Sequence, residues 1–190
     1  MIKSKLISKA TFYNKSGTKD TFNVTEVASM NQTHSNIVLE IKKSGVYDAD
    51  ALITTKKNLM LVVSTADCMP VVISDSTRVG IIHIGWKGLE NKIFFNAIKN
   101  FDKNKLKVSI GPHAKACCYE IQDDLSNKFP DYTIEKDEKK FLNLSGDIFL
   151  FCKKNNIDLE IANQCTIEDT MFYSYRRDKT SLRQESTIWI

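Results

Sequence analysis

Short apolar stretches separated by polar turns recur along the whole chain, and most show the alternation or the β-branched composition of strands. Strands are predicted at residues 3–13 and 22–30, joined to each other by a turn at residues 14–20. Further strands are predicted at 37–41, 59–64, 70–74, 79–84, 106–110, 159–162, 171–175 and 187–190. Apolar residues three and four positions apart predict amphipathic helices at residues 89–101 and 141–154, and a shorter helix is predicted at 123–129. Many strands mixed with a few helices predict an α+β fold in one domain.

The stretch from Thr65 to Gly88 contains the clearest local prediction, a β-hairpin whose two apolar strands flank a turn at residues 75–77. Cys68 comes just before the first strand, and His83 lies at the end of the second. A hairpin brings its outer ends together, so we expect this thiol and this imidazole to lie side by side. Taken singly, each also has an ordinary structural interpretation, as a buried thiol or as a core histidine.

A third candidate residue is His34, in the polar loop at residues 31–36. Two imidazoles and a thiolate match the three protein ligands of a catalytic zinc site, which keeps its fourth position open for water or substrate. Asp67, next to Cys68, is placed to act as an acid–base or ligand-orienting carboxylate, and a turn aspartate is an equally good interpretation. Spacing alone does not single out zinc, because the sequence has no CxxC or HExxH motif.

Two other chemistries use the same residues. His34, Cys68 and His83, with Met69 or Met30 as a weak axial ligand, also describe a blue-copper centre and hence a copper-dependent phenol oxidase. A multi-copper centre needs more imidazoles than the three histidines of this chain. Without any metal, Cys68 and His83 form a nucleophile–base pair for an amidohydrolase acting on a peptide or a cell-wall precursor. The residues themselves leave these alternatives open.

Arginine is scarce, and three of the four arginines lie close together in the sequence: Arg176, Arg177 and Arg183. The guanidinium fork binds phosphate and carboxylate groups, so these residues are candidate ligands for an anionic substrate. The alternative interpretation is a solvated surface strand.

Composition narrows the classes of function. The 190 residues are 42% hydrophobic, and a formal net charge of +4 is carried mostly by scattered lysines, so we expect no nucleic acid partner. No apolar run approaches the roughly 18–20 residues of a membrane helix, and the lysine-rich start is unlike a signal peptide. We therefore expect a cytoplasmic protein without membrane contact. Five cysteines without a repeated spacing argue against a disulfide framework, and the oligomeric state is not predicted.

Several motifs, taken together and in this order, resemble the YfiH/laccase-domain family, whose members are also described as polyphenol oxidoreductase-like or purine nucleoside phosphorylase-like. The motifs extend over about residues 30–190, and their combination is specific. They are QTHS at 32–35, ADAL at 49–52, TADCMPV at 65–71, HIGWKG at 83–88, GP at 111–112, CYEI at 118–121, CT at 165–166 and FYSYRRD at 172–178.

The resemblance implies a single YfiH/laccase-type domain at residues 1–190, with a shortened N-terminal segment at about 1–30. It implies an α/β/β/α layered sandwich with mixed sheets, shared distantly with cysteine deamidase toxins. It also implies zinc bound by His34, Cys68 and His83, and a catalytic centre at Asp67, Cys68 and His83. Purine nucleosides and phosphate would be the substrates. The charge of Arg176, Arg177 and Arg183, rather than the resemblance, makes these residues the candidates to bind the phosphate.

The reactions that the resemblance implies are phosphorolysis of adenosine, inosine and methylthioadenosine, and deamination of adenosine by attack of water at C6. Family members usually begin with a longer segment that contains paired glycines, which the first 30 residues of this sequence lack. The expected consequence is a more open pocket or an altered activity, and a binding protein without turnover is the non-enzymatic alternative.

Overall fold

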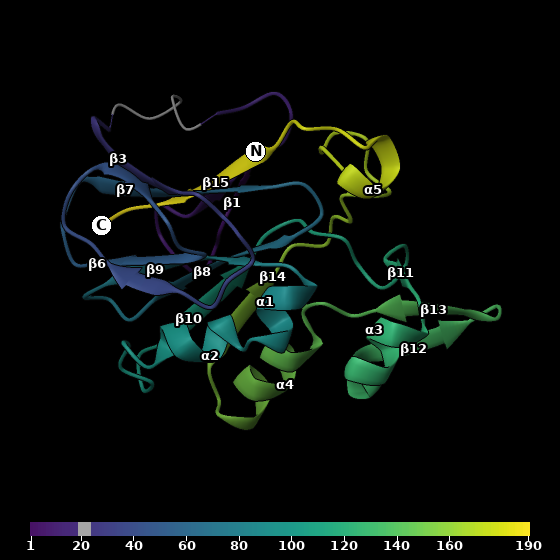
Figure 1. The fold of residues 1–190 in the computed structure, drawn as a ribbon. Coiled ribbons are helices and arrows are strands. Elements are labelled where there is room, and N and C mark those ends of the chain that lie inside the picture. Colours follow the sequence, from purple (N-terminus) through teal and green to yellow (C-terminus); the bar gives the residue numbers. More distant parts are fainter. Residues whose placement is uncertain (19–23) are drawn as a thin grey trace.

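Two stacked six-stranded sheets form the body of the protein, as seen in a computed structural model that describes residues 1–18 and 24–190 (Figure 1). The first sheet has the order β1 (Ile2–Lys3), β2 (Thr11–Phe12), β15 (Gln184–Ile188), β7 (Leu59–Thr65), β3 (Glu26–Met30) and β5 (Gly45–Tyr47). The second has the order β14 (Asp158–Ile161), β10 (Lys107–Ile110), β8 (Met69–Ser74), β9 (Val79–Ile84), β6 (Ala51–Thr54) and β4 (Val38–Glu40). Both sheets mix parallel and antiparallel pairs, so the predicted α+β fold with mixed sheets is confirmed.

Helices cover the outer face of the second sheet, and a small third sheet lies at one end of it (Figure 1). The covering helices are α1 (Trp86–Glu90), α2 (Ile93–Ile98) and α4 (Gly146–Lys154). The third sheet consists of β11 (Glu120–Ile121), β13 (Lys139–Leu142) and β12 (Thr133–Lys136), with α3 (Asp123–Lys128) and the 3₁₀ helix η2 (Pro130–Tyr132) beside it. The last helix, α5 (Tyr175–Asp178), is a single turn. In the described part of the chain, no helix is both long enough and apolar enough to cross a membrane.

The second sheet has apolar side chains on both faces because it lies between two layers. Along β8, Val72 packs into the core between the sheets, whereas Val71 packs under the helices, and Ile81 and Ile82 of β9 divide in the same way. Successive strand residues point to opposite faces, so a continuous apolar run is what a strand buried on both sides requires. Each of these fully buried side chains contributes roughly 1.5–3 kcal/mol relative to an exposed position.

The predicted hairpin is confirmed as β8 and β9. Pro70 pairs with His83 and Met69 with Ile84, so the residue before β8 and the end of β9 lie together. The connecting turn is held by the side chain of Asp75, whose Oδ1 accepts hydrogen bonds from the backbone N–H groups of Thr77 and Arg78 at 3.0 and 2.9 Å. This hairpin therefore places Cys68 beside His83, as its sequence predicts.

The first strand predictions are wrong in their pairing. Residues 3–13 do not form one strand: they include the end of β1 and all of β2, and these two short strands pair with each other across an intervening turn. The predicted strand at residues 22–30 corresponds to β3, which pairs with β5 and β7 rather than with its neighbour in sequence. The predicted turn at residues 14–20 extends beyond the described residues.

Three later predictions also need correction. The helix predicted at residues 89–101 is two helices, α1 and α2, separated at Lys92, whose φ of 57° is left-handed. The helix predicted at 141–154 begins only at Gly146, because Phe141 and Leu142 complete β13. The strand predicted at 171–175 is absent, because the carbonyl groups of residues 171–173 have separate partners: the N–H of Lys15, Nη2 of Arg177 and Nε2 of Gln184, in that order.

Candidate functional site

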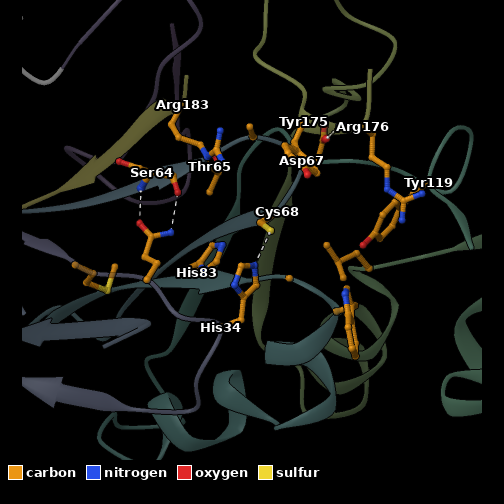
Figure 2. A pocket seen from close by; sticks show the side chains of 16 residues that line it. His34, Ser64, Thr65, Asp67, Cys68, His83, Tyr119, Tyr175, Arg176 and Arg183 are labelled. Carbon is orange, nitrogen blue, oxygen red and sulfur yellow. Dashed lines mark hydrogen bonds between the residues drawn. The ribbon is translucent and has the colours of Figure 1, made fainter. Parts of the chain in front are cut away.

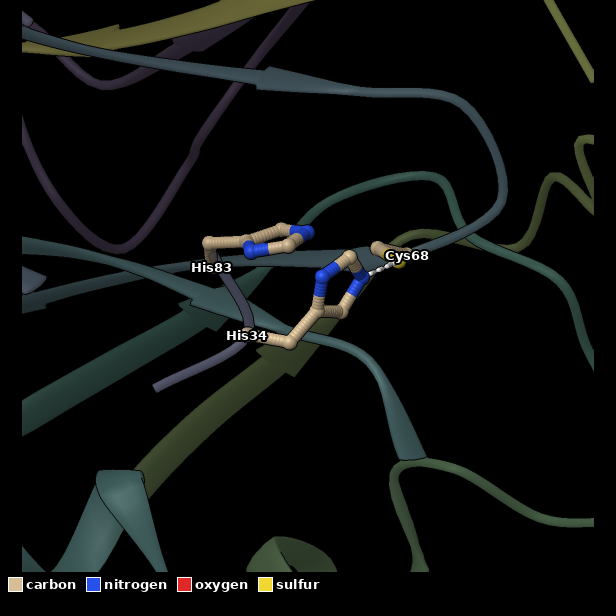
Figure 3. Close-up of side chains that lie close together, drawn as sticks. All are labelled: His34, Cys68 and His83. Atoms are coloured by element: carbon tan, nitrogen blue, oxygen red, sulfur yellow. Dashed lines mark hydrogen bonds between the residues drawn. The ribbon is translucent and has the colours of Figure 1, made fainter. Parts of the chain in front are cut away.

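His34, Cys68 and His83 lie together, so the geometry that the sequence predicts for this trio is present (Figure 3). Their potential ligand atoms all lie within 4.8 Å of one another. The Sγ of Cys68 is 3.7 Å from Nε2 of His34, and the two imidazole rings have their centroids 4.7 Å apart in an edge-to-face arrangement. Three segments supply the trio: the loop before β4, the loop between β7 and β8, and the end of β9.

Asp50, just before β6, fixes both histidines. It is fully buried, and its Oδ1 lies 2.7 Å from Nδ1 of His83 and accepts a hydrogen bond from the backbone N–H of His34 at 3.1 Å. Its Oδ2 accepts from the N–H of Thr33 at 3.2 Å and from the N–H and Oγ of Ser35 at 2.6 and 2.7 Å. These bonds hold His34 in a left-handed backbone conformation, φ 62°, which is uncommon for a residue with a side chain.

The electrostatics of the cluster follow from these contacts. Burial alone would raise the pKa of Asp50, but hydrogen bonds from His83 and Ser35 lower it to about 2. Burial alone would lower the pKa of His83, but the bonds to Asp50 and Cys68 raise it to about 9. Burial raises the pKa of Cys68, but its interactions with His34 and His83 outweigh burial and lower it to about 6. Cys68 is therefore available as a thiolate near neutral pH, which is the form that binds metals and attacks carbonyl carbons.

The three residues fit a zinc ion in two respects. The contact between Nδ1 of His83 and Asp50 leaves Nε2 of His83 as the metal-facing nitrogen, an arrangement that metal-binding histidines commonly show. Gly85 leaves space beside the cluster, because a Cβ there would lie 2.9 Å from Cδ2 of His34 and 3.0 Å from Sγ of Cys68. Two nitrogens and one sulfur are three of the four ligands that zinc requires, so the donor set is that of an open site.

Asp67 lies beside Cys68 at the edge of the same pocket, and it connects three loops. Its backbone is left-handed, φ 81°, and its side chain is buried. Oδ1 accepts a hydrogen bond from Oγ1 of Thr166 at 2.8 Å, and Oδ2 accepts one from the backbone N–H of Arg176 at 2.6 Å. The carboxylate therefore orders the loop that carries the arginines, and its acid–base role stays a prediction.

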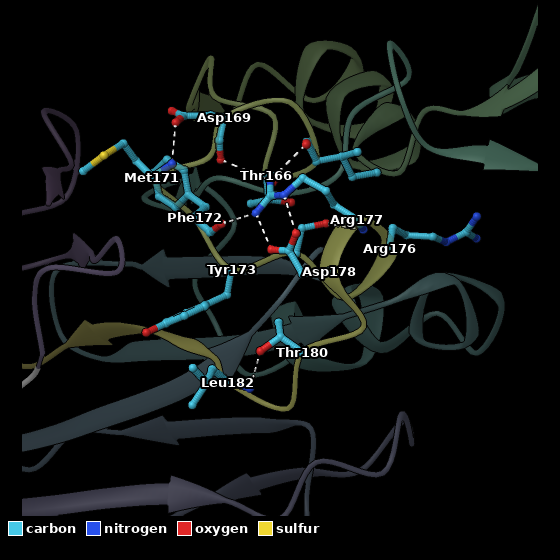
Figure 4. Close-up of polar contacts among 12 residues, drawn as sticks. Thr166, Asp169, Met171, Phe172, Tyr173, Arg176, Arg177, Asp178, Thr180 and Leu182 are labelled. Carbon is cyan, nitrogen blue, oxygen red and sulfur yellow. Dashed lines mark hydrogen bonds and ion pairs between the residues drawn. The ribbon is translucent and has the colours of Figure 1, made fainter.

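The structure does not bring Arg177 to the pocket (Figure 4). Its Nη1 donates to the carbonyl oxygens of Thr166 and Ile167 at 2.8 and 3.0 Å, and its Nη2 donates to that of Phe172 at 2.8 Å. Its Nε and Nη2 also bond to the carboxylate of Asp178. The N–H groups of this guanidinium all bond within the loop at residues 166–178. They therefore stabilise the loop, and none is left to bind a phosphate.

Arg176 and Arg183 do line the pocket, which has a volume of about 540 Å³ (Figure 2). The guanidinium of Arg176 lies over the ring of Tyr119, 4.7 Å from its centroid, and Nη1 donates to the carbonyl of Glu120 at 2.7 Å. Arg183 lies near Thr65 and donates to the carbonyls of Thr180 and Leu182. The pocket therefore places two positive side chains around the same cavity as the imidazole–thiol cluster, and its size is ordinary for a small-molecule site.

Sequence reasoning assigned no role to several residues that build this pocket. Asp50 is the acidic residue of the ADAL motif at residues 49–52. The signal that could have identified it is a charged residue at the start of a buried strand. Gln32 bonds through its side-chain amide to both the N–H and the C=O of Ser64, at 2.9 and 2.7 Å. Trp86 and Tyr119 form aromatic walls, and nothing in their local sequence indicates that they face one cavity.

Comparison with known proteins agrees with the fold and identifies the family. Residues 9–190 match the family described as multi-copper polyphenol oxidoreductase laccase. The chain is 38% identical over 182 residues to a purine nucleoside phosphorylase of Clostridium acetobutylicum, covering 86% of this chain and 76% of that protein. It is 32% identical over 165 residues to a purine nucleoside phosphorylase of Aquifex aeolicus, covering 84% and 80% of the two chains.

Solved structures show the same fold. A Neisseria meningitidis protein superimposes with a TM-score of 0.76 at 28% identity, covering 86% of this chain and 74% of that one. The Bacillus licheniformis protein YfiH gives a TM-score of 0.73 at 23% identity, covering 85% and 72%. The resemblance to the YfiH/laccase-domain proteins predicted from the motifs is therefore confirmed.

Proposed function

The chain belongs to the family described as multi-copper polyphenol oxidoreductase laccase, and we propose that within this family it is a zinc-dependent purine nucleoside enzyme. The relatives named purine nucleoside phosphorylase support an enzyme of that kind. The observation that carries the proposal is the position of the His34–Cys68–His83 cluster in the same pocket as Arg176 and Arg183. A phosphorolytic enzyme must hold an anion next to a polarised nucleoside, and this combination offers groups for both tasks.

The proposed substrates are adenosine, inosine and methylthioadenosine with phosphate, and the proposed second reaction is the deamination of adenosine. In phosphorolysis, a phosphate oxygen forms a bond to C1′ of the ribose while the bond from C1′ to the purine nitrogen breaks and the base leaves with the electron pair. Arg176 and Arg183 bind the phosphate and offset its charge. Trp86 and Tyr119 offer flat apolar walls against which a purine ring can pack.

His34, Cys68 and His83 would hold the zinc ion, which supplies a Lewis acid and lowers the pKa of water at its open position. Asp50 orients the imidazole of His83 and holds the backbone of His34, and its negative charge increases the basicity of His83. Asp67 is proposed to accept a proton from the attacking water during deamination, in which water adds to C6 and ammonia leaves. Each carboxylate oxygen of Asp67 accepts one hydrogen bond in the structure and keeps a second lone pair for this purpose.

The test combines metal analysis with product analysis. Purified protein is expected to contain zinc and to convert adenosine and phosphate into adenine and ribose 1-phosphate, with inosine formed by deamination. Cys68→Ser should lose both the zinc of this site and the activity, whereas Cys152→Ser is the matched control, because Cys152 is a buried thiol in α4 away from the pocket. Turnover that survives in Cys68→Ser, or stoichiometric copper with a blue thiolate band, would overturn the proposal.

One geometric observation favours a second candidate function. Asp50, His83 and Cys68 follow one another in contact, so the carboxylate orients an imidazole that in turn interacts with a thiol. This is the arrangement of a cysteine nucleophile with its base and orienting acid, and it supports a metal-independent amidohydrolase. Chelation followed by alkylation separates the two functions. The amidohydrolase would keep its activity after chelation and lose it after alkylation, and the zinc enzyme would lose it after chelation and regain it with zinc.

A further inference from the structure

Three cysteines outside the pocket meet where two loops approach each other: Cys117, Cys118 and Cys165. Their sulfurs all lie within 4.8 Å of one another, and those of Cys117 and Cys118 are 3.0 Å apart. All three are free thiols, with Cys117 exposed, Cys118 half-buried and Cys165 buried. The nucleoside chemistry proposed above uses none of them.

The backbone holds these sulfurs in place. Cys165 forms an isolated parallel bridge with His113, and the N–H of Thr166 donates to the carbonyl of His113 at 3.1 Å. The N–H of Lys115 donates to the Sγ of Cys165 at 3.5 Å, so the loop that carries Cys117 and Cys118 is tied directly to the third thiol. Because both loops are already ordered, binding of a ligand to the sulfurs would cost little additional conformational entropy of the chain.

A fourth donor and a compensating charge lie next to the thiols. The Oε2 of Glu168 is 3.9 Å from the Sγ of Cys117. Lys115 lies close enough to Cys165 and Cys117 for its charge to interact with theirs. Three thiolates and a carboxylate would carry four negative charges, which a divalent cation and Lys115 together largely neutralise.

We propose that Cys117, Cys118, Cys165 and Glu168 form a second metal site, which takes a soft divalent cation of the zinc type in tetrahedral coordination. In a tetrahedral site with metal–sulfur bonds of about 2.3 Å, neighbouring sulfurs lie about 3.8 Å apart. The observed separations, from 3.0 Å to at most 4.8 Å, bracket that value. On binding, the S–H bonds break, metal–sulfur bonds form, and the released protons pass to the solvent.

With four protein ligands and no open position, this site is structural rather than catalytic. It would join the loop before Tyr119 to the loop after Cys165, and both of these loops support the pocket. Tyr119 stacks on Arg176, and Thr166 bonds to Asp67. The cation would therefore stabilise the wall of the pocket without contacting a substrate. The site does not depend on the proposed nucleoside chemistry.

The experiment measures zinc per chain in full-length protein that has been loaded with zinc under a thiol reductant and then freed of loosely bound ions by gel filtration. The variants are Cys117→Ser, Cys68→Ser, the double variant, and Cys152→Ser as a matched thiol control. Cys117 is exposed, so its replacement by serine leaves the buried packing intact. Thermal unfolding with and without added zinc gives a second readout.

We expect about two zinc ions per chain in the unmodified protein and in Cys152→Ser, about one in each single site variant, and none in the double variant. Zinc should raise the unfolding temperature of Cys68→Ser but not that of the double variant. Equal zinc content in the unmodified protein and Cys117→Ser would overturn the second site. If Cys68→Ser alone keeps its full zinc content while Cys117→Ser loses an ion, the second site stands and the zinc centre of the pocket fails.

Discussion

Asp50→Asn tests whether the buried carboxylate controls the candidate metal centre. The substitution keeps the size of the side chain but replaces one acceptor oxygen with an NH₂ group. If the NH₂ takes the place of Oδ1, it faces Nδ1 of His83 and the N–H of His34. If it takes the place of Oδ2, it faces the N–H groups of Thr33 and Ser35. Either orientation removes the acceptor from two groups, of which the ring of His83 is buried and the backbone N–H groups of residues 33–35 are only partly buried.

The structure sets the expected size of the effect. An unsatisfied buried donor costs about 1–3 kcal/mol. Because the backbone donors here are only partly buried, we expect the low end of that range for each group, about 2 kcal/mol for two, divided between folding and zinc binding. Loss of a partner that orients a metal ligand typically weakens metal affinity 10- to 100-fold, which is about 1.4–2.8 kcal/mol. We therefore expect Asp50→Asn to bind zinc 10- to 100-fold more weakly and to be less stable in its zinc-free form.

Competition with a chromophoric chelator measures the zinc affinity, and urea unfolding of the zinc-free protein measures the stability. Asp48→Asn is the matched control, because Asp48 lies two positions earlier and its carboxylate accepts a hydrogen bond from the side chain of Asn31, at 2.9 Å, away from both histidines. Its zinc affinity should equal that of the unmodified protein. A folded Asp50→Asn protein with unchanged zinc affinity would show that Asp50 does not orient the metal ligands.

Three further substitutions test other parts of the site and its support. Gly85→Ala adds a Cβ within 3.0 Å of Cys68 Sγ, so chelator competition should show weaker zinc binding, and unchanged binding would mean that the ligands can move aside. Arg177→Lys removes the planar guanidinium that bonds the carbonyls of Thr166, Ile167 and Phe172, so the free energy of unfolding in urea should fall by about 2–4 kcal/mol. A change confined to the KM for phosphate would show instead that this residue binds the substrate. Burial raises the pKa of Asp75, but hydrogen bonds from Asp102, Thr77 and Arg78 lower it below the unfolded value of about 3.9. Its stabilising contribution is therefore complete above that pH and is lost as the pH falls through the folded pKa. The stability difference between the unmodified protein and Asp75→Asn should narrow in acid, and a difference that stays constant with pH would contradict this reasoning.

Local patterns in the sequence predict the parts of the fold whose hydrogen-bond partners are close in the chain. The β8–β9 hairpin was predictable because its turn and its two apolar runs are adjacent, and its geometry then placed Cys68 beside His83. The pairing of β3 with β7 and β5 was not, because parallel partners are chosen by packing across the sheet rather than by a local turn. The prediction of one strand at residues 3–13 fails for a different reason: β1 and β2 are close in the chain, but the residues between them contain no Gly, Pro, Asn or Asp to indicate a turn.

The site shows a similar division. The donor chemistry of His34, Cys68 and His83 could be predicted from residue type and the motif resemblance. The support that Asp50 gives to them could not, because it depends on a loop folding around a buried carboxylate. Arg176 and Arg177 are neighbours with the same chemistry, yet one lines the pocket and the other holds a loop. Which way each side chain points is decided by α5, a single turn that no pattern in the sequence predicts.

The position of β15 has a consequence for how the protein is made. This strand follows all the others in sequence, yet it lies inside the first sheet, between β2 and β7. A chain emerging from the ribosome can form the β8–β9 hairpin early, but β2 and β7 must wait for residues 184–188 before they are joined. Until residues 184–188 have emerged, the edge of β7 that pairs with β15 lacks its neighbour. The nascent chain should therefore be most prone to aggregation during this interval.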